Sequence, residues 1–390
     1  MEYQFPSNVR SVRPSLIREF SNNVKQYKDA IDLTLGQPDF PTPERVKQAG
    51  IKAILENHTG YTKNDGIAEL RQAAAKYLKE QSHVTYDPEW EIMVTCGATE
   101  AVDVAFRTIL SGGDDVLIPA PAYAGYEPLI RFCGAVPKYI DTRDNDFILT
   151  AEMLDQAYTP YSRCLLLTYP NNPTGATLNK AQMDEIVAWL EKHPDIYVIT
   201  DEIYSALTFE GSHISIASYP SIWSRCILIS GVSKAYSMTG WRIGFLAGPE
   251  WIIKGCNKLQ GQYTSGTCSV SQKAAEAAYT LDQSAVEEMR QAFERRRDLI
   301  VKLAKEVPGL EVNIPQGAFY LFPKCNSYFG KSNGDKTINN STDFAMYLLE
   351  EAHVATVGGD AFGDPDCFRM SYATSDENIK EAIRRIKEAL

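Results

Sequence analysis

The chain has 390 residues, of which 44% are hydrophobic and 23% charged, and its 50 acidic and 39 basic residues give a formal charge of −11 at pH 7. This length exceeds the roughly 100–200 residues of one ordinary domain, so we expect a large core and a second, smaller unit. The negative charge would repel nucleic acid and anionic membranes, so we expect neither as a partner and small molecules as substrates.

Cysteine, histidine and the N-terminus exclude further classes. The 8 cysteines include no C-x-x-C pair, and the 5 histidines never form H-E-x-x-H, so we expect neither a disulfide framework nor a metal site. Residues 1–6 lack a basic region followed by an apolar run, and no stretch reaches the roughly 18 apolar residues of a membrane span. We therefore expect a cytoplasmic protein.

The first forty-odd residues lack strong periodicity. Residues 36–43 contain three prolines, which forbid a helix there, so we expect a fixed loop that crosses between the two units. Upstream, Ile17 and Arg18 lie in a segment that is a candidate to close over the side chain of a substrate. A change in substrate preference on replacing either residue would test this hypothesis.

From residue 91 the sequence alternates short apolar runs with amphipathic stretches such as 180–190. Continuously apolar runs are typical of strands buried on both faces; they lie at 115–119, 164–168, 196–200 and 226–230. This alternation predicts an α/β fold in which helices wrap a mostly parallel sheet. Ligands bind such sheets beyond the carboxyl ends of the strands.

From about residue 283 the pattern changes to long charged helices, which begin with 285–305. A strand-like stretch at 317–322 and a terminal helix after Ser375 follow, which indicates a smaller α+β domain. We expect an N-terminal segment, 1–45, that joins the small domain, a large domain, 46–283, and a small C-terminal domain, 284–390.

The first candidate site follows the predicted strand 91–95. Gly97, Ala98 and Thr99 lead into a predicted helix at 101–106, and the free N–H groups of such a turn can bind a phosphate. The alternative is an ordinary turn with threonine as the N-cap.

The next two strands also end in polar residues. Asn172 lies between two prolines that fix the backbone, and its amide can bond a phenolate oxygen, although a plain turn is an equal alternative. Asp201 ends the most apolar strand, where a carboxylate needs a positive partner such as the protonated pyridine nitrogen of pyridoxal phosphate. Tyr204 can donate to the same phenolate oxygen as Asn172. The alternative for Asp201 is an N-cap only.

Lys234 follows the fourth apolar run, among small residues. Poor hydration there lowers the pKa of a lysine and favours imine formation with an aldehyde. Arg242 can clamp the phosphate of the same ligand with its planar fork. The segment is neither G-x-S-x-G nor an S-x-x-K that ends at Lys234, so the pyridoxal interpretation is favoured.

Arg369 lies inside an otherwise apolar strand-like run, 367–373. A buried arginine needs an anionic partner, and the α-carboxylate of a substrate would form a bidentate pair with it. The alternative is an internal salt bridge.

Together these pieces resemble the class I/II aminotransferases of fold type I. The resemblance spans almost the whole chain in order; it rests on Gly36 with Pro38, Asn172-Pro173-Thr174-Gly175, Asp201-Glu202-Ile203-Tyr204, Ser233-Lys234, Thr239-Gly240-Trp241-Arg242, Gly317-Ala318-Phe319-Tyr320 and Arg369-Met370-Ser371-Tyr372. Within the family the chain is most similar to bacterial aminotransferases for aromatic amino acids or N-acetyl-L,L-diaminopimelate, through 106–110, 121–126 and 237–241.

The resemblance implies transfer of an amino group from an L-amino acid, possibly aromatic, aspartate or N-acetyl-L,L-diaminopimelate, to a 2-oxo acid such as 2-oxoglutarate. Lys234 would hold pyridoxal phosphate as a Schiff base, with Asp201 and Tyr204 as the other catalytic residues. The implied cofactor contacts also include Gly97, Ala98, Thr99, Tyr123, Asn172 and Arg242, with Tyr61 reaching in from the partner subunit of a homodimer. The implied contacts of the substrate carboxylate are Gly36, Asn172 and Arg369.

The chain departs from the family pattern at two positions. Gly231 stands where relatives often carry a phosphate-binding serine, so Ser230 or Ser233 is expected to substitute for it. Gly358 stands where the family usually has proline, which leaves the local loop geometry open.

The sequence leaves two alternative functions open. A carbon–sulfur lyase uses the same cofactor, and release of pyruvate from cystathionine without an amino acceptor would identify it. A non-catalytic aminotransferase-like sensor domain of a transcription regulator would need a DNA-binding extension, and the negative charge argues against contact with DNA.

Overall fold

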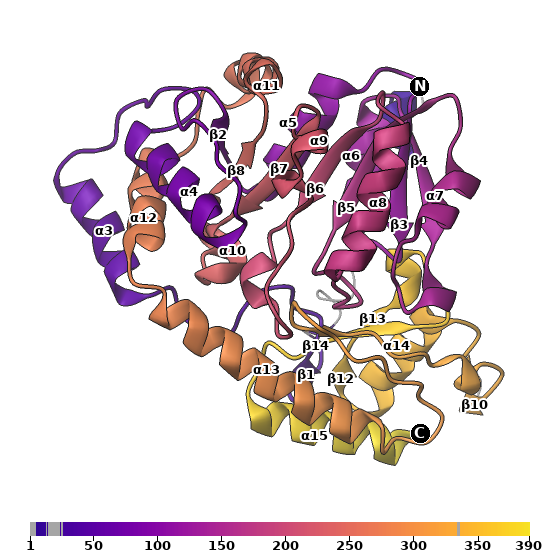
Figure 1. Cartoon of the computed structure of the whole chain (residues 1–390). Coiled ribbons are helices and arrows are strands. Elements are labelled where there is room, and N and C mark those ends of the chain that lie inside the picture. Colours follow the sequence, from indigo (N-terminus) through magenta and orange to yellow (C-terminus); the bar gives the residue numbers. More distant parts are fainter. Residues whose placement is uncertain (1–4, 13, 15–23, 25, 334–335) are drawn as a thin grey trace, which may run out of the picture.

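The computed structural model describes residues 5–12, 14, 24, 26–333 and 336–390. A seven-stranded sheet with the order β2-β8-β7-β6-β5-β3-β4 forms its centre (Figure 1). Its strands are β2 (Ile92–Thr95), β3 (Asp115–Ala120), β4 (Val136–Asp141), β5 (Ser162–Thr168), β6 (Tyr197–Asp201), β7 (Cys226–Gly231) and β8 (Gly244–Ala247). Strand β8 pairs antiparallel with both β2 and β7, and the other pairs in this sheet are parallel, so the prediction of a mostly parallel sheet is confirmed.

Helices cover both faces of this sheet, because its strands are buried on both sides. One face packs on α5 (Ala98–Ile109), α6 (Tyr126–Phe132) and α11 (Glu250–Tyr263). The opposite face packs on α3 (Glu44–Leu55), α4 (Ala68–Gln81), α8 (Lys180–Lys192) and α12 (Ser269–Thr280). The predicted helix at 180–190 is therefore confirmed, with apolar residues such as Trp189 turned to the core.

A second core lies below the large sheet in Figure 1. It is built on a three-stranded sheet, β13-β14-β9, and on long helices. These elements are α13 (Ser284–Ala304), β9 (Tyr320–Leu321), α14 (Ser341–Glu351), β12 (Val354–Ala355), β13 (Val357–Gly358), β14 (Phe368–Ser371) and α15 (Asp376–Ala389), with a hairpin of β10 (Ser332–Asn333) and β11 (Lys336–Thr337). The domain boundaries at 45 and 283 stay a prediction.

The predicted strand at 317–322 is shorter than expected. Only Tyr320 and Leu321 form β9, because Ala318 adopts a left-handed φ of 58° that interrupts extended backbone. Gly317 and Ala318 bond instead to the carbonyls of Gly175 and Leu207 in the large unit. This stretch therefore ties the two cores together.

The N-terminal part also connects the two cores. Strand β1 (Ile31–Asp32) pairs in parallel with β12 of the smaller unit. Residues 36–43 form no helix, as predicted, and α3 begins directly after Pro43. Asp39 in this loop bonds Arg296 of α13, while Thr42 bonds the carbonyl of Ser237 in the large unit.

The remaining elements are short. They are α1 (Ser7–Arg10), α7 (Ala151–Ala157), α9 (Pro220–Trp223) and α10 (Val232–Ala235), and the 3-10 helices η1 (Arg143–Asn145), η2 (Ser205–Leu207), η3 (Ile216–Ser218), η4 (Thr239–Trp241), η5 (Asn326–Tyr328) and η6 (Gly359–Phe362). Among the described residues, no helix has the length and apolar character needed to span a bilayer.

Candidate active site

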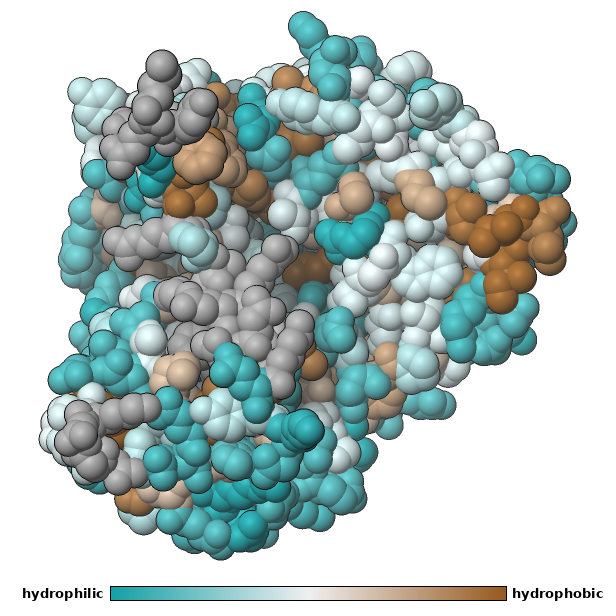
Figure 2. Space-filling view, turned by 180° about the vertical axis from the view of Figure 1, so that it is seen from behind, coloured by the Kyte–Doolittle hydropathy of each residue, from teal (hydrophilic) through white to brown (hydrophobic). Residues whose placement is uncertain are grey.

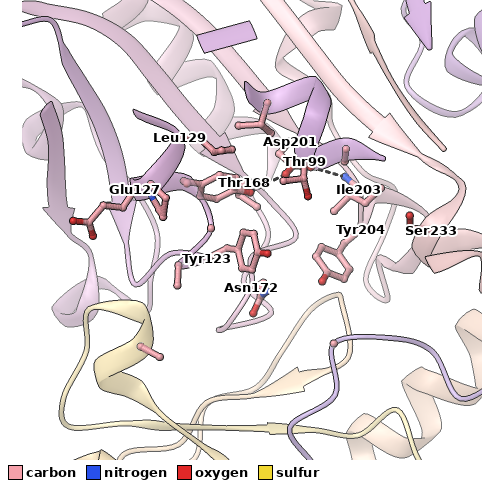
Figure 3. A pocket seen from close by; sticks show the side chains of 18 of the residues that line it. Thr99, Tyr123, Glu127, Leu129, Thr168, Asn172, Asp201, Ile203, Tyr204 and Ser233 are labelled. Atoms are coloured by element: carbon pink, nitrogen blue, oxygen red, sulfur yellow. Dashed lines mark hydrogen bonds between the residues drawn. The ribbon is translucent and has the colours of Figure 1, made fainter. Parts of the chain in front are cut away.

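A cavity of about 1510 Å³ opens at the carboxyl ends of the parallel strands, where the large and small units meet. Figure 3 shows Tyr123, Asn172 and Tyr204 around one open space, with Asp201 above them. The predicted site residues that line the cavity are Gly36, Ala98, Thr99, Tyr123, Asn172, Asp201, Tyr204, Ser233, Lys234, Arg242 and Arg369. Residues far apart in the sequence therefore meet in one place.

Lys234 lies in α10, directly after β7, and its ammonium donates a hydrogen bond to the carbonyl of Gly36. Burial lowers the pKa of Lys234 to about 8, and the positive charges of Arg369 and Arg242 add to this effect. With this pKa, roughly a tenth of the Lys234 side chains carry the neutral amine at pH 7, far more than for an ordinary lysine. A neutral amine is the form that attacks an aldehyde.

Asp201 is the last residue of β6 and accepts hydrogen bonds from the Tyr126 hydroxyl, at 2.8 Å, and from the Ile203 amide, at 3.2 Å. Burial raises the pKa of Asp201 to about 6, although both hydrogen bonds oppose that shift. The alternative that Asp201 is only an N-cap is wrong, because the next helix, η2, begins at Ser205 with Tyr204 as its N-cap. A buried carboxylate at the mouth of the sheet is suited to a cationic partner.

The turn after β2 lies beside Arg242, an arrangement that is suited to an anion. Helix α5 begins at Ala98, its N-cap is Gly97 with φ 79°, and no side chain caps it. The alternative of a threonine N-cap is therefore wrong, and the first N–H groups of α5 are available to a ligand. Arg242 lies beside this turn and donates to the carbonyls of Thr239 and Cys96, and a side chain at Gly97 would collide with its guanidinium.

Arg369 in β14 is buried, with 1% of its surface exposed. Its guanidinium donates to Asn172 Oδ1 at 2.9 Å and to the Thr34 carbonyl at 2.7 Å, and it lies 4.5 Å from the ring centre of Tyr320. No carboxylate pairs with it in the described part of the chain, and its Nε has no partner there. The alternative of an internal salt bridge is not found, so this buried cation is suited to the carboxylate of a ligand.

The two asparagines after β5, Asn171 and Asn172, form different contacts. Asn171 Oδ1 accepts from the amide and the hydroxyl of Thr174, as in a turn. Asn172 Oδ1 accepts from Arg369 and lines the cavity. The plain turn therefore describes Asn171, whereas Asn172 belongs to the site.

Of the two serines expected to replace the usual one, Ser233 lines the cavity and Ser230 does not. The structure also explains why position 231 is glycine: a Cβ there would lie 2.8 Å from the Gly244 Cα and 2.9 Å from the Ile243 carbonyl oxygen on the neighbouring strand. A serine at 231 would therefore push β7 and β8 apart.

The other departure from the family pattern, Gly358, lies in an ordinary backbone conformation. Gly358 has φ −59° and ψ 140°, which are the angles that a proline adopts. A Cβ there would lie 2.8 Å from the Thr342 amide nitrogen. The close approach of α14, and no unusual backbone conformation, explains the glycine.

Tyr61 does not line the cavity of its own chain and is 98% exposed. Ile17 and Arg18 lie outside the described residues.

Two tyrosines of the site were given no role by the sequence. The Tyr126 hydroxyl donates to Asp201 and accepts from Thr168, and the Tyr320 hydroxyl shares a hydrogen bond of 2.8 Å with that of Tyr204. Both tyrosines occur in stretches that resemble the family, and this resemblance is the sequence signal by which they could have been found. Their partners are 75 and 116 residues away in the sequence, respectively, so local pattern does not reveal the contacts.

Replacing Tyr126 with phenylalanine tests its role. The hydroxyl lowers the pKa of Asp201, so its loss should raise that pKa above about 6 and reduce the ionised fraction of Asp201 at acid pH. We expect the acid side of the pH profile of kcat/KM to move up by about one pH unit, with little change above pH 8. The same change at Tyr139, which bonds Glu127 near the surface, should leave the profile in place.

Comparisons with known proteins agree with this geometry. Residues 28–386 match the family described as aminotransferase class I and II. The chain is 45% identical to the probable N-acetyl-LL-diaminopimelate aminotransferase of Bacillus subtilis (strain 168), over 99% of this chain and 96% of that protein. It is 42% identical to the bifunctional aspartate aminotransferase and glutamate/aspartate-prephenate aminotransferase of Petunia hybrida, over 98% and 82%. The crystal structure of the aspartate aminotransferase from Rhizobium meliloti superposes with a TM-score of 0.95 at 38% identity, over 99% and 98% of the two chains.

Proposed function

Since the chain belongs to the class I and II aminotransferases, which use pyridoxal phosphate, we propose that Lys234 holds this cofactor and that the preferred amino donor is a long-chain L-amino acid. The observation that carries the proposal is the convergence of Lys234, Asp201, Arg242 and Arg369 on one cavity. Each of them is suited to a different group of the reactants.

The residues present fit the cofactor. The turn before α5 and Arg242 suit its phosphate, the buried carboxylate of Asp201 suits its ring nitrogen, and the low pKa of Lys234 suits its aldehyde. Asn172 and Tyr204 are proposed to bond its phenolate oxygen, and Tyr123 to stack on its ring. Bound there, pyridoxal phosphate supplies an aldehyde that takes up amino groups and a ring that accepts electrons.

The chain itself supplies orientation and proton transfer. Arg369, Asn172 and the Gly36 backbone hold the α-carboxylate, which places the α-hydrogen of the amino acid near Lys234. The Lys234 amine removes this proton as a general base and delivers it again as a general acid. Buried aromatic residues that line the cavity, such as Tyr204 and Tyr320, keep water from the reacting atoms.

The donor is proposed to be N-acetyl-L,L-diaminopimelate, with 2-oxoglutarate as acceptor. Four cationic side chains of the described residues line the cavity: Arg131, Lys234, Arg242 and Arg369. Three of them have the roles given above, and Arg131 pairs with Glu127 at 2.7 Å. The volume of about 1510 Å³ leaves room for a long side chain, and the relative from Bacillus subtilis is named for such a substrate.

A panel of donors tests this preference. We would measure kcat/KM for N-acetyl-L,L-diaminopimelate, aspartate and phenylalanine with 2-oxoglutarate, and follow the cofactor absorbance as each donor is added alone. A kcat/KM for aspartate or phenylalanine above that for N-acetyl-L,L-diaminopimelate would contradict the proposed donor. Absence of any absorbance change with every amino acid would contradict the proposed role of the site.

The active unit is proposed to be a homodimer. Helix α3 exposes Ile51, Ile54 and Leu55, at 48%, 56% and 74%, and Tyr61 follows at 98%. Figure 2 shows hydrophobic side chains gathered at one edge, on the side where Figure 1, seen from the opposite direction, places α3. An exposed apolar patch of this kind is typical of a protein interface. A second copy of the chain would cover this patch and bring Tyr61 toward the cofactor phosphate in the neighbouring subunit.

Leu55→Asp tests the interface. We expect light scattering to show the mass of a monomer and kcat to fall at least about tenfold, because a buried unpaired charge costs several kcal/mol and Tyr61 no longer reaches its neighbour. Ile314→Asp is a matched control on the smaller unit, since Ile314 is 55% exposed. A Leu55→Asp protein that stays a dimer would contradict this interface.

The location is proposed to be the cytoplasm. Five of the eight cysteines are buried free thiols, among them Cys164 and Cys226 in the central sheet, which suits a reducing compartment. Cell fractionation tests this, and recovery of the protein with secreted material would contradict it.

A further inference from the structure

Asp201 and Glu202 are adjacent carboxylates that lie on opposite faces of the central sheet. Asp201 faces the cavity and bonds Tyr126 of α6. Glu202 follows directly, and because successive side chains of extended backbone alternate, it points to the face that packs on α4 and α8. Its side chain is 2% exposed, so a second carboxylate is buried directly behind the first.

Two hydroxyls and one imidazole lie against the Glu202 carboxylate. Its Oε1 accepts from the hydroxyl of Thr200 at 3.1 Å and from that of Ser215 at 2.6 Å. Its Oε2 lies 2.9 Å from Nε2 of His213, whose side chain is 9% exposed. Neither Oε2 nor Nε2 has a hydrogen-bond partner among the described residues, so their close approach is a contact between a carboxylate and an imidazole.

His213 is the described basic side chain that lies against this carboxylate. No lysine or arginine of the described chain forms an ion pair with Glu202. The other titratable groups near Glu202 are Tyr77, Tyr86 and Cys226, and burial raises the pKa of each, that of Tyr77 to about 12. These three groups therefore stay neutral at physiological pH.

The charge of Glu202 reaches Asp201. It raises the pKa of Asp201, in addition to the larger effect of burial, whereas Lys234, on the cavity side, lowers it. A protonated His213 would offset the charge of Glu202, because two opposite charges 2.9 Å apart act at a distance nearly as a neutral dipole.

We propose that Glu202 and His213 form a buried ion pair in which His213 offsets the effect of Glu202 on Asp201, and that both are positioning residues for the ring nitrogen of the cofactor. This inference rests on the proposed role of Asp201. Neither side chain touches the cavity, so both act through Asp201 alone. The pair explains why a glutamate is tolerated in the core next to a functional aspartate.

The test is the pH dependence of cofactor affinity. Apoprotein is titrated with pyridoxal phosphate between pH 5 and 8, and the midpoint of the loss of affinity on the acid side is compared between variants. Because every variant binds the same ligand, differences between midpoints report on the protein. His213→Gln should move the midpoint up by about one pH unit, Glu202→Gln should move it down, and the double variant should return it toward the wild-type value.

Controls separate this effect from misfolding. His83→Gln makes the same change on an exposed ring and should leave the midpoint in place. Equal shifts of the two single variants in one direction, or no shift in either, would overturn the ion pair as a device that acts on Asp201. If Asp201→Asn keeps the acid-side loss of the wild type, the proposed role of Asp201 fails instead, so the two failures are distinguishable.

Discussion

Lys234→Ala is expected to lower kcat at least about 10⁴-fold, because one side chain supplies both the attachment of the cofactor and the proton transfer. The amine has no neighbour that can replace it: no other lysine of the described chain lines the cavity. Steady-state kinetics with 2-oxoglutarate measure the loss, and the absorbance of the bound cofactor should change at the same time.

Lys254→Ala is the control for this variant. Lys254 is exposed on α11 and pairs with Glu250, so its loss removes one positive charge without touching the cavity. We expect wild-type kinetics from it. A Lys234→Ala enzyme with more than about a hundredth of the wild-type kcat would contradict the assignment.

Arg369→Lys is expected to lower kcat/KM about 10²- to 10³-fold, mainly through KM. The planar fork of arginine can bond a carboxylate through two N–H groups while it also satisfies Asn172 and Thr34, whereas an ammonium cannot hold this geometry. The variant loses one charged hydrogen bond and leaves one buried acceptor without a partner. Together these two effects cost about 3–4 kcal/mol, which corresponds to that factor.

Substrates with and without the α-carboxylate give a sharper test of Arg369→Lys. Amino donors and oxo acids share the α-carboxylate, so both should lose affinity to a similar extent. The corresponding decarboxylated amine has no such group, so its slow reaction should change little. Arg384→Lys on the surface of α15, where Arg384 pairs with Glu381 and Glu388, should behave as the wild type. An equal loss with the decarboxylated amine would contradict a carboxylate-binding role.

Much of the fold could be predicted from the sequence, because buried parallel strands are continuously apolar and end in a turn. The runs around Leu166 and Leu228 locate their strands to within two residues. Segments that bond to both units were harder to predict. The stretch at Ala318 looks like a strand, but its backbone turns to bond a different unit, and only the tertiary structure shows this.

The residues of the site likewise divide into those that the sequence predicts and those that only the structure reveals. Lys234 and Asp201 were expected because they follow directly from strand ends, where the chain delivers side chains to the cavity. Tyr126 and His213 were not expected to take part, because each acts through a contact with a residue on another segment. The choice between Ser230 and Ser233 also required the structure, since it depends on which side of the chain faces the cavity.

The bonds of Arg369 have a consequence for biosynthesis. Its two acceptors, Thr34 and Asn172, precede it by 335 and 197 residues. A ribosome has therefore released the whole large sheet, including Lys234, before the anchor for the substrate carboxylate exists. A nascent or truncated chain that stops before β14 lacks that anchor even when its central sheet is folded. Among the proposed cofactor and substrate contacts, Arg369 is the last to be synthesised, so a substrate-dependent spectral change is expected only of a chain that extends through β14.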